Sequence, residues 1–489
     1  MLVKGVFQME HKDLSSIKPS FLGSLSVILF LCITLTVQVI LYGSPEIHTT
    51  IIFSCTYAII VAMASGFKWK TIEEGIMHGC KLAMIPMLIL MLIGVLIPTW
   101  IAAGTIPTLI YYGLKIISPT FFLLTTALVC AVASVATGSS WTTGATFGVA
   151  CMGISVGLGI PAPMTAGAVI SGAILGDKMS PLSDSTNLAA GVSEANLFDH
   201  IRSMTYTTGP AFVISLIIFT ILGFQFSGGA VDTTAITNIL GGIQSSFKMT
   251  PMSSILSLIP LVIVVVLAVK NVSGVAVMVI ASLVGLALAV IVQGRGLYEM
   301  MNFMNYGFVI ETGTETVDKL FNRGGLQSMM WTVSLGFLGL SFGGILEKTR
   351  MLEVLLEKMS GLVRKQGNLI LTHVISTIAV NVFSASQYMA ILIPGRMFLP
   401  AYKKLGIKNM VCSRTCEDSG TVTSPLVPWG LCGVFFAGTL GVSTMEYLPY
   451  TYLALITPLV AVIYGYTGLF IFKEEKEEIK NDKQSPADM

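Results

Sequence analysis

Long runs of apolar residues constrain this chain more than any other feature of its sequence. Examples that are about twenty residues long and nearly without charge are 22–42, 82–104, 209–226, 274–293 and 450–472. As helices rising ~1.5 Å per residue, they are long enough to cross the ~30 Å hydrocarbon core of a bilayer. Unpaired backbone groups are costly in lipid, and the short alternating segments of a barrel are absent, so helices are expected. The predicted fold is an all-α polytopic membrane protein.

The overall composition excludes several classes of function. Hydrophobic residues make up 54% of the chain and charged residues 11%, which is too little charge to cover a soluble protein of this length. A formal net charge of +2, without a basic run interleaved with aromatics, argues against nucleic acid as a partner. Because no phosphate-binding glycine loop and no His/Cys metal spacing occurs, we expect no enzyme, no cofactor and no metal other than sodium. The energy source would then be an ion gradient.

The second half of the chain repeats features of the first half at an offset of 244 positions. The Ser-Pro-Leu sequence at 180–182 falls on the same sequence at 424–426, and apolar spans fall on apolar spans. Thr137, Ser140 and Thr142 fall on Asn381, Ser384 and Ser386. These matches lie where both halves interrupt their apolar pattern, which favours an internal duplication. The predicted organisation is a leader at 1–20, a first membrane half at 21–248 (repeat core about 82–227), a second half at 249–472 (repeat core about 326–471) and a charged tail at 473–489.

The distribution of lysine and arginine predicts that the second half is inverted relative to the first. Loop 348–365 holds five basic residues, whereas the equivalent 104–121 holds only Lys115. Short cytoplasmic loops are enriched in basic residues, so these two loops should face opposite sides. Both termini and loop 66–81 are then predicted to be cytoplasmic, in a bacterial inner membrane. Two inverted repeats with re-entrant hairpins or broken helices, in about 10–13 membrane segments, are typical of alternating-access transporters.

The segment 172–193 places charged and hydroxyl side chains inside apolar surroundings. Charged residues inside a membrane are expensive, so Asp177, Lys178 and Asp184 call for an explanation. A solvated loop is one explanation. The other is a cation site, because Gly176 and Pro181 break the helix, and carboxylates, freed carbonyls and hydroxyls such as Ser180 and Thr186 are ligands for dehydrated sodium. Lys178 would neutralise a neighbour, snorkel or meet an organic anion.

The counterpart of that segment, 414–430, again combines charges, hydroxyls and prolines. Glu417 and Asp418 are adjacent, so on a helix they diverge by ~100° and cannot both face one ion. One of them could pair with Arg414 or titrate. Ser424 is a further candidate ligand. Arg396 could hold an anionic substrate or act as a counter-ion for Glu417 or Asp418.

Upstream of each charged segment lies a small polar cluster, 137–143 in the first half and 381–387 in the second. Each is flanked by apolar runs, as the tip of a re-entrant hairpin or a helix break would be. Ser140, Thr142, Ser386 and Gln387 are the predicted tip residues. Asn381 and Ser384 are predicted to join the cation and proton site, because amide and hydroxyl oxygens coordinate a cation without adding charge. Plain helix–helix contacts are the alternative interpretation.

The segment GDKMSPLSDSTNLAAG, residues 176–191, resembles the signature of the NhaC-type sodium/proton antiporters within the ion-transporter superfamily. The resemblance implies sodium/proton exchange, and the family includes relatives that exchange malate with protons for lactate with sodium. It also implies two inverted repeats, and it supports Asp177, Ser180 and Asp184 as cation-site residues. It assigns no role to Glu417 or Asp418.

Three hypotheses remain from the sequence. The first is sodium/proton exchange by alternating access, in which a proton and a sodium ion compete for a carboxylate that is partly withdrawn from water. The second couples sodium or protons to an organic acid or amino acid, and the third is a channel or membrane scaffold. The expected partners are sodium ions, protons and the lipid bilayer, with a small organic acid under the second hypothesis. The chain could also form a homodimer.

Overall fold

The computed structural model describes residues 17–42, 46–226, 233–270, 272–360 and 365–474. Most of the predicted leader and of the predicted charged tail lies outside these residues. Within them the regular structure is helical, apart from an isolated bridge between Ile407 and Lys473. Nine of the described helices are long and apolar enough to cross a membrane, or up to eleven if two bent pairs each count as one span. The predicted all-α polytopic membrane fold is confirmed.

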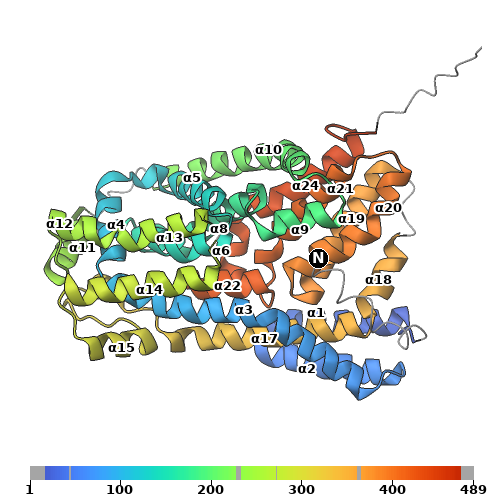
Figure 1. Cartoon of the computed structure of the whole chain (residues 1–489), viewed down its shortest axis with the longest axis horizontal. Coiled ribbons are helices and arrows are strands. Elements are labelled where there is room, and N and C mark those ends of the chain that lie inside the picture. Colours follow the sequence, from blue (N-terminus) through green and yellow to red (C-terminus); the bar gives the residue numbers. More distant parts are fainter. Residues whose placement is uncertain (1–16, 43–45, 227–232, 271, 361–364, 475–489) are drawn as a thin grey trace, which may run out of the picture.

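Two helices come first, and a set of elements that is interrupted by breaks and turns follows them (Figure 1). The helices are α1 (Phe21–Tyr42), α2 (Ile47–Ala64), α3 (Trp69–Ala102), α4 (Thr105–Ile116), α5 (Pro119–Thr137), α6 (Ser140–Thr143), the π-helical turn η1 (Gly144–Gly148), α7 (Val149–Gly157), α8 (Ala162–Met179), α9 (Asp184–Val192) and α10 (Leu197–Phe224).

Two of these helices begin before their apolar spans do. Residues 66–81 were predicted as a loop, but α3 starts at Trp69, and its Gly75 and Gly79 pack closely on the backbone of another helix. Helix α10 starts at Leu197, since the Asn196 side chain accepts hydrogen bonds from the backbone N–H groups of Phe198 and Asp199. Both helices therefore carry polar residues beyond the predicted spans.

Two further sets of helices follow. The connecting set is α11 (Thr233–Ser246), α12 (Pro251–Ser257), α13 (Ile259–Val269), α14 (Gly274–Ile291), α15 (Leu297–Tyr306) and α16 (Glu315–Phe321). The last set is η2 (Leu326–Met329), α17 (Met330–Lys348), α18 (Met351–Ser360), α19 (Gln366–Ser384), α20 (Gln387–Lys404), α21 (Asn409–Cys416), the π-helical turn η3 (Glu417–Thr421), η4 (Ser424–Leu426), α22 (Leu431–Leu440), α23 (Thr444–Tyr447), η5 (Leu448–Tyr450) and α24 (Tyr452–Thr467).

The first and last sets are repeats whose equivalent residues stand 247 positions apart. Helices α5 and α19 both have 19 residues and match end to end at this offset, as Pro119–Thr137 and Gln366–Ser384. Helix α8 likewise matches 409–426, which the structure divides into α21, η3 and η4. The offset of 244 predicted from the sequence is therefore three positions short. Thr137 corresponds to Ser384 and Ser140 to Gln387, and the two Ser-Pro-Leu sequences are not equivalent.

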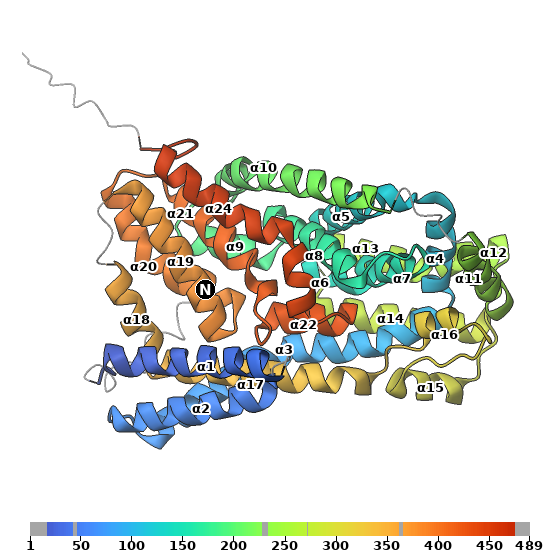
Figure 2. The ribbon, with the colours of Figure 1, turned by 180° about the vertical axis from the view of Figure 1, so that it is seen from behind.

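The two repeats are inverted, because equivalent helices lie against each other and run antiparallel. Gly75, near the start of α3, packs against Gly344, near the end of α17, and Gly94 packs against Gly325, just before η2. The same holds for α10 and α24. Ring contacts join Phe219 to Tyr452 at 5.1 Å, and Tyr206 to Phe470, beyond the end of α24, at 4.6 Å. Figure 2 shows α3 with α17 on one side of the molecule and α10 with α24 on the other.

Each repeat contains a helix break that places polar residues inside the molecule. The residue that follows α5 is Gly138, with φ +66°, and the residue that follows α19 is Ala385, with φ +55°. The next residue is a serine in both repeats: Ser139 accepts from the backbone N–H of Thr142, and Ser386 accepts from that of Met389. Because each cap satisfies one of the open N–H groups, the chain can turn and restart a helix at this depth.

Candidate functional site

The carboxylate of Asp177 lies at the end of α8 and is held by two hydroxyls. Ser140, at the first break, donates to Oδ2 at 2.7 Å, and Ser183 donates to Oδ1 at 2.6 Å. Among the described residues, Asp177 has no ion-pair partner. No described cation neutralises this carboxylate, and the oxygens of the two hydroxyls lie beside it.

The second repeat carries a neutral counterpart of this arrangement. Ser424 is equivalent to Asp177, and Gln387 to Ser140, at the offset of 247. The Ser424 hydroxyl donates to the Gln387 amide oxygen at 3.3 Å, and the Gln387 amide nitrogen donates to the Thr421 hydroxyl at 3.2 Å. The two breaks thus form the same contact with different chemistry, and the negative charge belongs to the first one.

A buried ion pair joins the two repeats beside Asp177. Lys178 and Asp418 are both 0% exposed, and the Lys178 ammonium donates to Oδ1 of Asp418. Thr207, on α10, donates to the same oxygen at 2.8 Å. The other oxygen, Oδ2, lies 3.9 Å from Nε of Arg414. Asp418 is thus surrounded by two cations and a hydroxyl.

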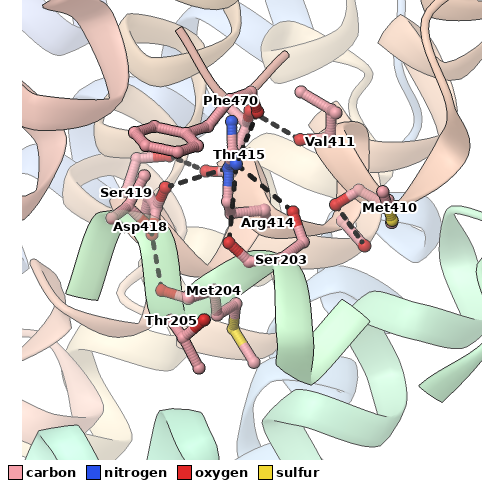
Figure 3. Close-up of polar contacts among 12 residues, drawn as sticks. Ser203, Met204, Thr205, Met410, Val411, Arg414, Thr415, Asp418, Ser419 and Phe470 are labelled. Carbon is pink, nitrogen blue, oxygen red and sulfur yellow. Dashed lines mark hydrogen bonds and ion pairs between the residues drawn. The ribbon is translucent and has the colours of Figure 1, made fainter. Parts of the chain in front are cut away.

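Arg414 is buried and is hydrogen-bonded to α10 and to the segment that follows α24, as Figure 3 shows. One of its guanidinium nitrogens donates to the Phe470 carbonyl at 3.0 Å and to the Ser203 hydroxyl at 3.3 Å. Ser203 and Thr207 both lie on α10, one turn apart, so this helix contacts Arg414 and Asp418 together. Lys178 therefore contacts Asp418 directly, and Arg414 lies beside it with its own hydrogen bonds to Ser203 and Phe470.

Glu417 differs from its neighbour Asp418. Its side chain is 0% exposed, yet neither carboxylate oxygen has a hydrogen-bond partner among the described residues. Adjacent positions of a helix point ~100° apart, which explains why Asp418 meets Lys178 and Glu417 does not. The prediction that the two carboxylates diverge agrees with this geometry. An unpaired buried carboxylate is a candidate for a proton or a cation.

The other predicted residues of the first segment have different surroundings. Thr186 donates to the carbonyl oxygens of Asp177 and Lys178, at 3.0 and 2.9 Å. Ser180 is buried and donates to the Val135 carbonyl at 2.9 Å, which ties the end of α8 to α5. Asp184 starts α9, is exposed and has no hydrogen bond to the carboxylate of Asp177.

The predicted residues of the two polar clusters, 137–143 and 381–387, bond mainly to backbone groups. The Asn381 amide nitrogen donates to the Gly420 carbonyl at 2.6 Å and to the Thr423 hydroxyl at 3.0 Å. Ser384 donates to the Val380 carbonyl at 2.7 Å, and Ser386 caps α20. Thr142 donates to the Ser139 hydroxyl in the first break. Arg396 is exposed on α20, and the cations described beside Asp418 are Lys178 and Arg414.

Three contributing hydroxyls were not among the predicted site residues. Thr207 and Ser203 belong to the start of α10, ahead of the span predicted from Gly209, and Ser183 lies within the predicted segment 172–193. The signal was present in the polar run 199–208, which precedes the apolar part of that helix. A span predicted from apolar length alone therefore leaves out the polar first turns of α10.

The chain has two inverted repeats with paired helix breaks, and a carboxylate and an ion pair lie between them. This is the architecture of secondary transporters, a class of polytopic membrane protein. Within this class, the chain belongs to the Na+/H+ antiporter family, whose sequence model matches residues 10–186 and 172–469.

Three relatives illustrate the range within this similarity. The chain is 40% identical over 431 residues to the Na+/H+ antiporter NhaC of Alkalihalophilus pseudofirmus, covering 88% of this chain and 92% of the relative. It is 38% identical over 454 residues to the malate-2H+/Na+-lactate antiporter of Bacillus subtilis, with coverages of 93% and 96%. It is 35% identical over 473 residues to the arginine/ornithine antiporter ArcD of Halobacterium salinarum, covering 96% of both chains.

Proposed function

We propose that this protein exchanges sodium ions for protons across the cytoplasmic membrane by alternating access, with Asp177 as the carboxylate that binds the transported cation. Both termini lie on the cytoplasmic side in this proposal. The relatives named as Na+/H+ antiporters support the activity, and the inverted repeats support the mode of transport.

The observation that carries the proposal is the environment of Asp177. Its carboxylate accepts from two hydroxyls and has no described counter-ion, at a break where two repeats meet. A sodium ion prefers oxygen ligands of this kind. A proton would neutralise the same carboxylate, so the two cations compete for one charge, and a carrier with such a site exchanges them.

Glu417 supplies a second carboxylate for the same cycle. It is buried without a hydrogen bond or a described ion pair, so its negative charge would gain from a proton or from a nearby sodium ion. Asp418 is less suited to this role, because Lys178 and Thr207 already occupy one of its oxygens. We therefore place Glu417 with Asp177 on the transport path.

Exchange of an organic acid or amino acid is the second candidate, and the malate/lactate and arginine/ornithine relatives favour it. A carboxylate solute would need a free cation in the site. The buried cations Lys178 and Arg414 both face Asp418, and Arg396 is exposed, so the described geometry favours simple cation exchange.

The test is to record the internal pH of proteoliposomes when sodium is added, first alone and then with malate, lactate or amino acids. Wild type should move protons with sodium alone. Asp177→Asn should lose this movement by about tenfold or more, because the amide cannot carry the charge that either cation neutralises. Asp199→Asn, an exposed acid at the start of α10, is the matched control and should retain wild-type exchange.

Either of two results would contradict the proposal. Proton movement that appears only with an organic acid would make the protein a solute exchanger. Full activity of Asp177→Asn would remove Asp177 from the cation site.

A further inference from the structure

Lys178 is buried, where the charge of a lysine is costly unless it is paired. It is 0% exposed in the last turn of α8, and its ammonium contacts Oδ1 of Asp418 in the other repeat. Burying an unpaired charge is costly, and breaking a buried pair is more costly than replacing it by apolar residues. The ion pair of Lys178 with Asp418 is therefore poorly explained by stability alone. Its position next to Asp177 points to another role.

Lys178 and Asp177 behave as one unit of the chain. They are consecutive on a helix, so their side chains point ~100° apart, one toward the second repeat and the other toward the first break. Thr186 donates to the backbone carbonyls of both residues, at 3.0 and 2.9 Å. A shift of Lys178 would therefore be passed to the Asp177 carboxylate.

The far end of the ion pair is firmly held. Asp418 accepts from Thr207 on α10 at 2.8 Å, and Arg414 lies 3.9 Å from its other oxygen. Arg414 in turn is bound to Ser203 and to the Phe470 carbonyl (Figure 3). Lys178 is thereby anchored through Asp418 to α10 and to the segment that follows α24.

This anchor exists on one side of the repeat symmetry. At the offset of 247, Lys178 corresponds to Pro425 and Asp418 to Ser171, which cannot form an ion pair. The equivalent of Asp177, Ser424, is also neutral. The ion pair of Lys178 with Asp418 and the Asp177 carboxylate therefore occur together, and both are missing from the equivalent positions of the other repeat.

We propose that Lys178 is a positioning residue for cation binding: through its ion pair with Asp418 it fixes the end of α8, so that Asp177 is presented to Ser140 and Ser183. This inference rests on the proposed role of Asp177. It gives Lys178 a purpose other than contact with an organic anion. It also makes Asp418 the fixed ion-pair partner of the Lys178 ammonium.

The experiment measures sodium affinity separately from stability. Purified wild type, Lys178→Gln, Lys178→Arg and the exposed-lysine control Lys404→Gln are titrated with sodium, and the rise in unfolding temperature is recorded at each concentration. In parallel, the sodium dependence of proton movement is measured in proteoliposomes. Lys178→Gln is expected to fold, because Asp418 keeps Thr207 and Arg414.

Lys178→Gln should raise the half-saturating sodium concentration about tenfold with a maximal rate within about twofold of wild type, since misplacing a ligand weakens binding. Lys178→Arg, which keeps the charge, should restore affinity to within about threefold. Lys404→Gln should match wild type. A merely structural lysine would lower the unfolding temperature without sodium and leave the half-saturation unchanged, and that result would overturn the inference.

Two further outcomes are distinguishable. If wild type neither gains stability from sodium nor exchanges it, the proposed function fails and the inference fails with it. If wild type binds sodium and Lys178→Gln gives no folded protein, Asp418→Asn takes over the test, because its amide oxygen can still accept from Thr207. An unchanged sodium affinity in Asp418→Asn would overturn the inference while the proposed function stands.

Discussion

Thr207 shows how a single hydroxyl supports the charges at the centre of this molecule. It donates to Oδ1 of Asp418 at 2.8 Å, the oxygen that also receives the Lys178 ammonium. In a buried site the carboxylate cannot turn to water for a further hydrogen bond. The hydroxyl therefore supplies a second donor to the oxygen that Lys178 contacts.

Thr207→Val removes this donor and keeps the shape of the side chain. We expect a loss of about 1 kcal/mol in the free energy of unfolding, the usual size of a buried hydrogen bond in a membrane protein, with more when the acceptor is charged. Thermal unfolding of the purified protein measures it. Thr220→Val, on the same helix, is the control, because Thr220 donates only to the Leu216 carbonyl at 2.7 Å. Equal stability of both variants would show that Asp418 does not depend on Thr207.

The helix breaks show how the repeats differ at the scale of an element. Gly138 and Ala385 occupy equivalent left-handed positions, with φ +66° and +55°. Glycine tolerates this conformation, whereas alanine is strained in it. Ala385 also accepts a backbone hydrogen bond from Leu431 at 2.8 Å, which helps to hold it there. The two breaks thus have the same shape at different energetic cost.

Exchanging these residues should give unequal effects. Gly138→Ala adds left-handed strain and places a Cβ 2.7 Å from Cβ of Leu182. We therefore expect a loss of about 2 kcal/mol or more in the free energy of unfolding. Ala385→Gly relieves strain but gives up a buried methyl worth ~0.8 kcal/mol, so its stability should stay within about 1 kcal/mol of wild type. Thermal unfolding of both variants checks this. A Gly138→Ala protein as stable as wild type would rule out the described turn.

The whole molecule is organised by the inversion of its repeats, which places equivalent loops at opposite ends. Pro161 and Lys408 are equivalent N-cap residues of α8 and α21 at the offset of 247. Lys18 contacts Glu357 of α18 at 2.8 Å, and α18 lies toward the same end as the last turns of α24 in Figure 1. Lys18 and the last turns of α24 therefore lie toward the same end of the molecule.

A pair of cysteine variants tests this topology. In a background without the eight native cysteines, Pro161→Cys should react with an impermeant maleimide added to whole cells, and Lys408→Cys should react only after permeabilisation. The reason is that equivalent positions of inverted repeats face opposite sides. Labelling of both positions from the same side would contradict the inversion, and reversed labelling would place the termini outside.

The membrane fold could be predicted from the sequence because it depends on local properties of the chain. Apolar length is sufficient to predict spanning helices, and the glycines, prolines and hydroxyls at 137–143 and 176–187 mark where those helices break. The duplication was also visible, because both halves interrupt their apolar pattern in the same order. The offset predicted from the sequence is three positions short, because it aligns the two Ser-Pro-Leu sequences. The structure instead aligns helices α5 and α19 over their full lengths.

The pairing of charges was decided by the tertiary structure. Lys178 and Asp418 lie 240 positions apart, and no local pattern indicates that they meet. The same packing leaves Glu417 without a hydrogen bond to its carboxylate among the described residues, exposes Asp184 and brings Thr207 of α10 into the cluster. The sequence alone determined which segments lie in lipid, because hydrophobic burial depends on the length and composition of each segment. Only the tertiary structure decided which charges are neutralised, because electrostatic contacts act over a few ångströms between residues that folding brings together.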